Sequence, residues 1–314
     1  MSKTFLVTGG AGFIGSHIVS RLLKEGAAVR VVDNLSTGNR DRLRVVERSI
    51  EFVVDDLTDP SVCDRAVRGV EYVLHQAAVP SVHRSVQDPV GTNRANITGT
   101  LNLLESCHKH SVRRLVYAAS SSAYGDTQVL PKREDMAPNP LSPYALQKFV
   151  GERYCKLYSD LYGLETVSLR YFNVFGPSQD PWSEYSAVIP KFATRLQKGQ
   201  SLVVYGDGEQ SRDFTYIDNV VEANLLAIRA AHAAGAVINV GCGESLTLNR
   251  LIRFLEEILE VQAVVDYEPP RRGDVRHSLA DISLARDMLG YQPTVTVREG
   301  LRRTVEFFVS NERR

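Results

Sequence analysis

The sequence predicts an α/β fold: a doubly wound parallel sheet with helices on both faces, followed by a smaller C-terminal α/β domain. Two observations lead to this prediction. In the first half of the 314 residues, short runs rich in Val, Leu and Ile alternate with longer segments of helical period, a pattern typical of parallel sheets covered by helices. From about Gly176 the pattern becomes irregular. We therefore expect a first domain over 1–176, a second mainly over 177–314, and elements near 215–241 that return to the first sheet.

Six short apolar runs have the length and composition of buried strands. In chain order they are Thr4 to Thr8, Ala28 to Val32, Glu51 to Val54, Tyr72 to His75, Leu115 to Ala118 and Thr166 to Leu169. The clearest helical segments between them are Phe13 to Glu25, Pro89 to His110 and Tyr144 to Tyr162. Doubly wound sheets bind ligands at the carboxyl ends of their strands, so the residues that follow each run are the first place to look for a site.

The composition limits the classes of partner and location. The 37 basic residues balance 37 acidic ones, which argues against nucleic acid or an anionic membrane as the main partner. The apolar run near the N-terminus, Thr4 to Val7, is too short for a signal peptide or a membrane span, so we expect a cytoplasmic protein. The four cysteines and seven histidines show no metal-binding or disulfide spacing, and no metal site is expected.

A glycine-rich segment, Gly9-Gly10-Ala11-Gly12-Phe13-Ile14-Gly15, directly follows the first predicted strand and opens the first helix. Glycines in this position permit a tight turn and close approach of the backbone to a pyrophosphate at the helix N-terminus, as in dinucleotide-binding (Rossmann) sheets. Asp33 closes the second strand, where its carboxylate can accept hydrogen bonds from a ribose diol. Because the acid also repels a 2′-phosphate, NAD is favoured over NADP.

Two further strand ends are candidates for cofactor contact. Asp56 and Leu57 follow the third strand, where the acid could bond the adenine and the leucine could pack on it. Ala77 and Ala78 follow the fourth strand, and their small side chains would let a cofactor lie close to the backbone. For these segments alone, turn formation and small-residue packing are equally good interpretations.

Tyr144 and Lys148 are four residues apart on a predicted helix, so their side chains share one face. A phenol with a pKa near ~10 acts as a base at neutral pH only if nearby positive charge stabilises its anion, and Lys148 is placed to supply that charge. The alternative is a packed tyrosine beside a solvating lysine. The serines at 120–122 follow the fifth strand, and a hydroxyl donor beside a phenolic base is what hydride removal from a carbinol needs.

Together these motifs resemble the extended short-chain dehydrogenases/reductases, and within them the UDP-hexose 4-epimerases. The resemblance covers essentially the whole chain. It rests on the motifs Val7 to Ser16, Asp33-Asn34-Leu35, Asn96 to Thr100, Ser120 to Ser122, Tyr144 to Lys148, Arg170 to Pro177 and Gly206 to Phe214.

The resemblance implies NAD as cofactor and a UDP-sugar as substrate. It places around NAD the residues Gly9, Gly12, Phe13, Ile14, Gly15, Asp33, Asn34, Ser36, Thr37, Gly38, Asp56, Leu57, Ala77, Ala78, Asn96, Tyr144, Lys148, Tyr171 and Val174. It places around the substrate the residues Ser81, Ser120, Ser121, Tyr144, Asn173, Ala187, Val188, Arg212, Arg271, Asp274 and Ser278.

The family's chemistry is a redox step that is reversed before product leaves. By resemblance, Ser120 and Tyr144 contact the sugar 4-hydroxyl, and Tyr144 takes its proton while hydride passes from C4 to NAD. The 4-keto sugar then turns over and receives hydride on its other face. Lys148 stabilises the tyrosinate and bonds the nicotinamide ribose. Arg212 and Arg271 suit the diphosphate because an arginine fork can grip phosphate oxygens with two bonds.

Differences from the glucose-restricted members of the family narrow the range of expected substrates. Those members carry a tyrosine where this chain has Ser278, so space is left beside the sugar C2. Where they carry a lysine after the fourth strand, Pro80 and Ser81 occur here. The segment from Tyr185 to Pro190 also resembles the pocket wall of members that act on N-acetylated sugars. We therefore expect UDP-N-acetylglucosamine and UDP-N-acetylgalactosamine as substrates, together with UDP-glucose and UDP-galactose.

The residue types at the site bear on the other activities that proteins of this fold have. The family's 4,6-dehydratases carry Thr-Asp-Glu where this chain has three serines, so elimination of water is not expected. A UDP-glucuronate 4-epimerase or decarboxylase is the enzymatic alternative, since His83 or Arg84 could face a C6 carboxylate. A non-catalytic dinucleotide-binding sensor is a third hypothesis, although such proteins typically lose the tyrosine or the lysine, and this chain retains both.

A homodimer is the expected assembly. In relatives, two equivalent long helices from each subunit form a four-helix interface. The predicted helices here carry apolar positions such as Leu101, Leu104, Phe149 and Leu157. A core-facing stripe has the same pattern.

Overall fold

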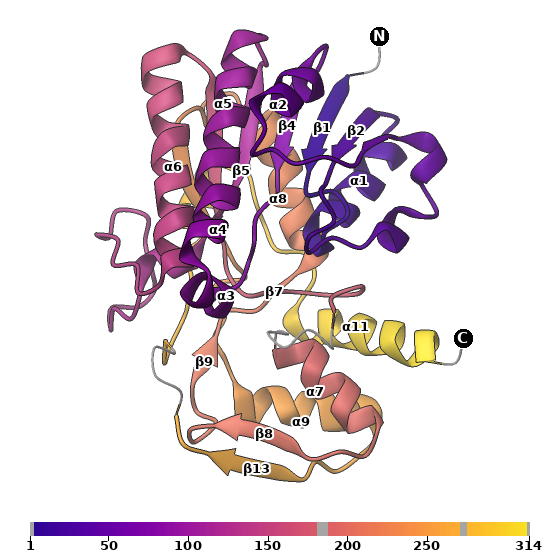
Figure 1. The fold of residues 1–314 in the computed structure, drawn as a ribbon. Helices are drawn as coiled ribbons and strands as arrows, with labels where there is room; N and C mark the ends of the chain where they lie inside the picture. Colours follow the sequence, from indigo (N-terminus) through magenta and orange to yellow (C-terminus); the bar gives the residue numbers. More distant parts are fainter. Residues whose placement is uncertain (1–2, 181–187, 271–274, 313–314) are drawn as a thin grey trace.

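The computed structural model describes residues 3–180, 188–270 and 275–312 (Figure 1). At its centre lies a seven-stranded sheet, and every neighbouring pair of strands is parallel. The strands are β1 Thr4–Thr8, β2 Ala28–Val32, β3 Glu51–Val53, β4 Tyr72–His75, β5 Arg114–Ser120, β6 Glu165–Tyr171 and β11 Ala236–Val240. All six predicted strands are present, so the predicted α/β fold is confirmed. β3 is one residue shorter than expected, whereas β5 and β6 extend further at both ends.

The strand order is β11-β6-β5-β4-β1-β2-β3. The chain runs outward from β1 to β3, then returns to lay β4 against the other side of β1. The loops that leave β1 and β4 therefore diverge, and open parallel sheets bind ligands in the crevice at such a reversal. This reversal places the glycine-rich turn after β1 beside the loop after β4.

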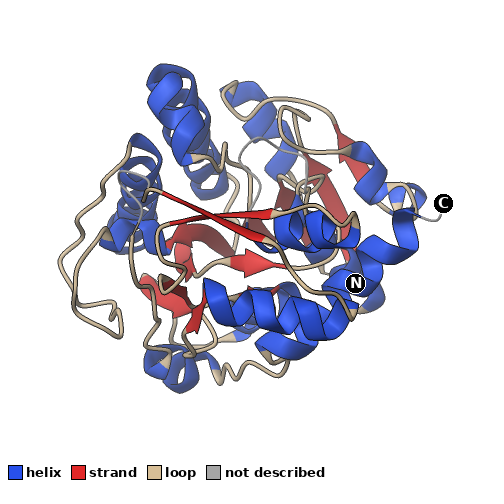
Figure 2. Ribbon diagram, turned by 90° about the horizontal axis from the view of Figure 1, so that it is seen from below, coloured by secondary structure: helices blue, strands red, loops and turns tan. Residues whose placement is uncertain are grey.

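Helices cover both faces of the sheet, as Figure 2 shows from below. α1 (Phe13–Lys24) and α8 (Ile217–Arg229) pack together on one face, while α2 (Pro60–Val67), α5 (Gly99–Lys109) and α6 (Pro143–Tyr162) pack on the other. Alternating strand residues supply two separate apolar cores. Phe5 and Val7 belong to the α1 side, and Leu6 between them belongs to the α2 side, as the two-residue period of a strand requires.

The predicted helix from Pro89 to His110 is not continuous. It consists of α4 (Pro89–Asn93), a wide π-helical turn η3 (Arg94–Thr98) and α5. The wide turn carries Asn96, whose amide is buried and bonded to neighbouring segments. π-helical turns occur mostly at functional sites, and this one lies beside the loop after β4. The short helix α3 (Val82–Gln87) precedes it.

A second set of elements lies below the carboxyl ends of the central strands in Figure 1. It comprises α7 (Val188–Gln197), β8 (Leu202–Tyr205), α9 (Leu248–Leu259), β13 (Val265–Glu268) and α11 (Val297–Glu312). β13 pairs in parallel with β8. The second set therefore faces the edge of the sheet at which the loops diverge.

The remaining elements are short. Four strands of two residues form two separate pairs. β7 (Val174–Phe175) pairs with β10 (Thr215–Tyr216), and β9 (Ser211–Arg212) pairs with β12 (Leu246–Thr247). The others are η1 (Arg40–Leu43), η2 (Glu47–Ser49), η4 (Ser121–Tyr124) and α10 (Ser283–Leu289). Within the described ranges, no helix is both long enough and apolar enough to cross a membrane.

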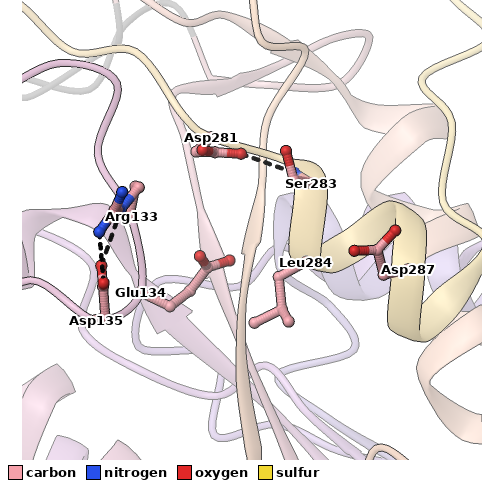
Figure 3. A pocket seen from close by; sticks show the side chains of 7 residues that line it. All are labelled: Arg133, Glu134, Asp135, Asp281, Ser283, Leu284 and Asp287. Atoms are coloured by element: carbon pink, nitrogen blue, oxygen red, sulfur yellow. Dashed lines mark hydrogen bonds and ion pairs between the residues drawn. The ribbon is translucent and has the colours of Figure 1, made fainter.

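The exposed side of edge strand β11 is covered by two loops that meet at Asn239. Its amide donates to the carbonyls of Lys132 (2.9 Å) and Asp281 (3.2 Å), and its N–H donates to Glu134 (2.8 Å). Figure 3 shows the hollow of about 320 Å³ beside these contacts, lined by Arg133, Glu134, Asp135, Asp281, Ser283, Leu284 and Asp287. None of these lining residues is a predicted site residue. The contacts close a sheet edge that would otherwise expose unpaired backbone groups.

Candidate active site

The glycine-rich turn after β1 has the shape that a pyrophosphate needs. Gly9 has a φ of +66°, and a Cβ on it would lie 2.6 Å from the Ala77 nitrogen. A Cβ on Gly15 would lie 2.2 Å from the Gly9 carbonyl oxygen, so this glycine lets α1 approach the turn. Gly12 is the N-cap of α1 and offers no side-chain cap to it. The first N–H groups of α1 are therefore directed at the crevice, where they attract an anion.

Asp33 is buried at the end of β2, beside that turn. Its carboxylate accepts hydrogen bonds from the N–H of Ala11 (2.9 Å) and the N–H of Leu35 (2.8 Å). Burial raises the pKa of this carboxyl, and the hydrogen bonds from Leu35 and Ala11 lower it. A carboxylate has about four acceptor positions, so positions are left for a ribose diol. Gly38 lies against it, because a Cβ there would be 2.7 Å from Oδ1.

The predicted adenine side forms a small polar group. The Asn34 amide donates to Asp56 Oδ2 (2.8 Å), and its Oδ1 accepts from the Ser36 N–H (3.0 Å). Thr37 is exposed next to them. Leu57 is buried in the core between α2 and α5, so most of its side chain packs inside the protein. The structure thus brings Asn34, Ser36 and Asp56 together. These features fit a dinucleotide along the crevice.

The remaining predicted cofactor residues lie at the start of α1, at the end of β6 and in β7, and two of them contact residues that were not predicted. Phe13 and Ile14 are partly buried at the start of α1, and the His17 ring lies 5.7 Å from the Phe13 ring. Tyr171 ends β6, and its hydroxyl donates to Asn224 of α8 (3.0 Å). That hydroxyl also bonds Gln76 (3.3 Å), which follows β4 just before Ala77 and Ala78. Val174 follows in β7, partly buried.

Ser120 and Tyr144 come together at the carboxyl end of β5. Ser120 is the last residue of the strand, and Tyr144 lies in the first turn of α6, which Ser142 caps by accepting from the Ala145 N–H (3.1 Å). Burial raises the pKa of Tyr144, and a hydrogen bond with the Ser120 side chain lowers it. The protein alone therefore leaves this phenol protonated at neutral pH. Ser121 begins η4 beside them.

Lys148 lies one helical turn after Tyr144 and is only 4% exposed. Burial lowers the pKa of Lys148 to about 8. Its ammonium lies 4.7 Å from the ring centroid of Tyr117 on β5. Tyr144 and Lys148 share one face of α6 as expected, but among the described residues the ammonium contacts this ring and not the Tyr144 oxygen.

Two buried polar residues fix the entry to α6. Ser85 on α3 is fully buried and accepts the Tyr144 N–H at 3.0 Å. Asn96 accepts the Val79 N–H (2.7 Å) and donates to Gln147 of α6 (2.8 Å). Asn96 thus connects the loop after β4 with the tyrosine helix. Of these residues only Asn96 was a predicted site residue: Gln147 lies within the Tyr144 to Lys148 motif but had no predicted role, and Ser85 lies outside the motifs.

The remaining predicted substrate residues lie on several segments of the chain. Arg212 on β9 donates to the Arg276 carbonyl (3.1 Å), and the Ser278 N–H donates to the Ser211 carbonyl (3.0 Å). These contacts bring Arg212 and Ser278 to one place. Asn173 has a φ of +26° and donates to the carbonyl of Asp213 (3.1 Å). Ser81 caps α3 by accepting from the Arg84 N–H (3.1 Å).

The last four predicted substrate residues are only partly within the described part of the chain. Val188 begins α7 and is partly buried. Ala187, Arg271 and Asp274 lie outside the described residues. Their predicted contacts with the UDP-sugar therefore stay predictions.

Comparisons with known proteins agree with this geometry. The NAD dependent epimerase/dehydratase family matches residues 5–241. The solved UDP-N-acetylglucosamine 4-epimerase of Methanobrevibacter ruminantium M1, in complex with UDP-N-acetylmuramic acid, is 41% identical, with a TM-score of 0.94 over 99% of both chains. The Thermus thermophilus UDP-glucose 4-epimerase in complex with NAD is 40% identical, with a TM-score of 0.89 over 98% of this chain and 99% of that one. The UDP-glucuronate 4-epimerase of Thermodesulfobacterium geofontis is 36% identical over 98% of this chain and 96% of its own.

Proposed function

We propose that this chain, which belongs to the NAD dependent epimerase/dehydratase family, interconverts UDP-N-acetylglucosamine and UDP-N-acetylgalactosamine, and also accepts UDP-glucose and UDP-galactose. At the coarser level, the chain is an NAD-dependent UDP-sugar 4-epimerase. The observation that carries the finer proposal is Ser278. Its small, 9% exposed side chain lies next to the Ser211–Arg212 strand, at the position where the family resemblance implies a tyrosine in glucose-restricted members.

In the proposed chemistry, Tyr144 accepts and returns one proton, and Ser120 forms a hydrogen bond with the substrate. Ser120 and Tyr144 bind the sugar 4-hydroxyl, and Tyr144 accepts its proton as the carbonyl forms. NAD, when bound, would supply the hydride acceptor and a positive charge near Tyr144. Lys148 bonds the nicotinamide ribose and adds a second positive charge. Tyr144 then returns the proton when the other face of C4 is reduced.

The cofactor is held by the turn from Gly9 to Gly15 and by Asp33. We propose that the other predicted cofactor residues line the same crevice. The nucleotide diphosphate is assigned to Asn173, Arg212 and Arg271, and the uridine ribose to Asp274. The first domain, 1–176 with α8 and β11, then holds NAD, and the remainder of 177–314 holds the UDP-sugar.

Assembly as a homodimer is part of the proposal. α6 carries an apolar surface stripe made of Leu146, Val150, Tyr154, Leu157 and Leu161, of which the three leucines are exposed. Leu101 and Phe149 are partly buried beside it, whereas Leu104 is fully buried in the core and does not belong to the surface. A contiguous apolar patch of this kind marks a protein interface. The cytoplasmic location stays a prediction from the sequence.

A second candidate function is 4-epimerisation or decarboxylation of UDP-glucuronate. It is favoured by the relative from T. geofontis and by His83 and Arg84 on α3, next to the Ser81 cap. A guanidinium there would pair with a C6 carboxylate. A non-catalytic sensor is disfavoured because Ser120 and Tyr144 are in contact.

The proposal is tested by incubating the purified protein with UDP-N-acetylglucosamine, UDP-N-acetylgalactosamine, UDP-glucose, UDP-galactose and UDP-glucuronate in separate reactions. Products are separated by chromatography. We expect interconversion within the first pair at the highest rate and slower interconversion within the second. Turnover of UDP-glucuronate alone would replace the proposal with its alternative, and NAD-loaded protein that changes no sugar would support the sensor.

A further inference from the structure

We propose that Tyr117 is a positioning residue for the reaction, whose ring face holds the Lys148 ammonium in place beside Tyr144. This inference rests on the proposed function, because it acts through Lys148. Tyr117 lies on β5, three residues before Ser120, and none of the sequence motifs assigns it a role in the chemistry.

The contact between the two residues has the geometry of a buried cation–π pair. The Lys148 Nζ lies 4.7 Å from the Tyr117 ring centroid, within the ~6 Å limit for such pairs. Tyr117 is 0% exposed and Lys148 only 4%. Water therefore hardly competes for the ammonium, and cation–π attraction is strongest under such conditions.

The Tyr117 ring cannot easily leave this position. Its hydroxyl donates to the Lys148 carbonyl (3.4 Å), so the tyrosine contacts both the backbone and the side chain of that residue. A Cβ on Gly151 would lie 2.2 Å from the hydroxyl, so a glycine one turn along α6 is needed to admit the ring. The glycine therefore makes room for the aromatic side chain that the Lys148 ammonium contacts.

The His75 ring also packs against Tyr117, with the two ring centroids 5.6 Å apart. Burial lowers the pKa of His75 to about 3, so the imidazole is neutral. Its Nδ1 contacts Thr8 (2.7 Å) and its Nε2 contacts Thr100 (2.9 Å). The Thr100 hydroxyl donates to the Asn96 carbonyl (2.7 Å) and so accepts from Nε2–H. A neutral, anchored imidazole adds no second cation to compete for the ring.

The Tyr117 ring is the main electrostatic stabilisation of the Lys148 ammonium, because the acidic groups near the ammonium are neutral or already paired. The titratable groups near the pair are Tyr144, Glu152 and Cys155 on α6 and His75 on β4. Burial raises the pKa of Cys155 to about 12 and also raises that of Tyr144, so both are neutral at pH 7. Glu152 is committed to a bidentate pair with Arg170 (2.7 and 2.8 Å).

The consequence of losing the ring face follows from the charges. Burial already lowers the pKa of Lys148 to about 8. Without the ring, the protonated lysine loses stabilisation and its pKa falls further, by about one unit for a desolvated pair. A neutral Lys148 no longer stabilises the Tyr144 anion, so the Tyr144 pKa rises. The acid limb of the pH profile therefore moves up while the alkaline limb moves down.

The test compares Tyr117→Phe with Tyr117→Leu in the NAD-loaded protein. We measure kcat and KM for the UDP-sugar that wild-type protein converts fastest, across the pH range. Tyr117→Phe keeps the ring face and is expected to retain wild-type kcat within a factor of about three. In Tyr117→Leu, kcat is expected to fall about tenfold to thirtyfold while KM changes little. The pH range of high activity is expected to narrow, because its acid limb moves up and its alkaline limb moves down.

A second variant keeps the shape and removes only the attraction. A trifluorinated phenylalanine at position 117 packs like phenylalanine but carries a weaker negative ring face, so it tests the inference even if Tyr117→Leu does not fold. The pH range over which the fluorinated variant is active is expected to be narrower than that of Tyr117→Phe. Equal pH profiles for the fluorinated and plain rings would overturn the role of Tyr117. Failure of wild-type protein to convert any UDP-sugar would instead overturn the proposed function.

Discussion

At the scale of single residues, Ser278 carries the proposed preference for N-acetylated sugars. Its backbone is fixed by the hydrogen bond from its N–H to the Ser211 carbonyl, so a larger side chain at this position has little freedom to withdraw. A tyrosine would occupy the space that the acetamido group at C2 needs. The unacetylated sugars carry only a hydroxyl there.

The prediction is that Ser278→Tyr lowers kcat/KM for UDP-N-acetylgalactosamine at least about hundredfold, a steric effect of roughly 3 kcal/mol, while UDP-galactose is spared. Ser278→Ala is the matched control, because it removes the hydroxyl but keeps the space, and it should leave both substrates near wild-type rates. The ratio of the two kcat/KM values is the measurement. A tyrosine variant with an unchanged ratio would remove Ser278 from the specificity argument.

The sequence predicted those site residues that follow a strand or open a helix. Ser120 and Tyr144 could be placed because the end of β5 and the start of α6 meet at one edge of the sheet. Ser85 could not, because it is 59 residues from the Tyr144 N–H that it accepts. The fourth strand's His75 is likewise defined by bonds to Thr8 and Thr100, 67 and 25 residues away. Such partners follow only from tertiary packing.

At the scale of elements, the contact between α1 and β1 depends on a glycine on each side. A Cβ on Gly15 would lie 2.2 Å from the Gly9 carbonyl oxygen, which is backbone and cannot rotate away. α1 would have to move off the sheet, and with it the uncapped N–H groups assigned to the pyrophosphate.

We therefore predict that Gly15→Ala destabilises the protein by about 1–3 kcal/mol and lowers its NAD content on purification. Gly99→Ala is the matched control, since a Cβ there meets Leu57 at an ordinary 3.5 Å. It should stabilise the fold by about 0.5–1 kcal/mol. Denaturant unfolding and cofactor absorbance are the measurements. Two alanine variants of equal stability would contradict the packing argument.

Element prediction succeeded where the apolar pattern was local. β1, β2 and β4 have the expected bounds because each is a short apolar run between turn residues. The break in the helix from Pro89 to His110 was missed, since the π-helical turn η3 is stabilised by Asn96 bonds to Val79 and Gln147 and not by a change of periodicity. A helix pattern does not show where a distant side chain widens a turn.

At the scale of the whole molecule, the exposed leucines of α6 predict the assembly. Leu157 is 42% exposed in the middle of the α6 stripe. A guanidinium there would be buried without a partner in the dimer but solvated in the monomer. Isolated Val45 is 95% exposed on a loop elsewhere, so an arginine at that position adds the same charge without touching the stripe.

Leu157→Arg is expected to raise the dimer dissociation constant at least about hundredfold, because an unpaired buried charge costs several kcal/mol. Val45→Arg should remain dimeric. Sedimentation at several protein concentrations measures both. If Leu157→Arg sediments as wild-type protein does, the α6 stripe is not the interface.

The central claim is that one hydrogen leaves C4 of the sugar and returns to the same carbon within one binding event. The direct measurement uses UDP-N-acetylgalactosamine deuterated at C4, incubated with the NAD-containing protein in ordinary water. The account predicts UDP-N-acetylglucosamine that retains deuterium at C4, and a rate that falls to background in Tyr144→Phe. Product in which solvent hydrogen has replaced the deuterium, or no product at all, would contradict it.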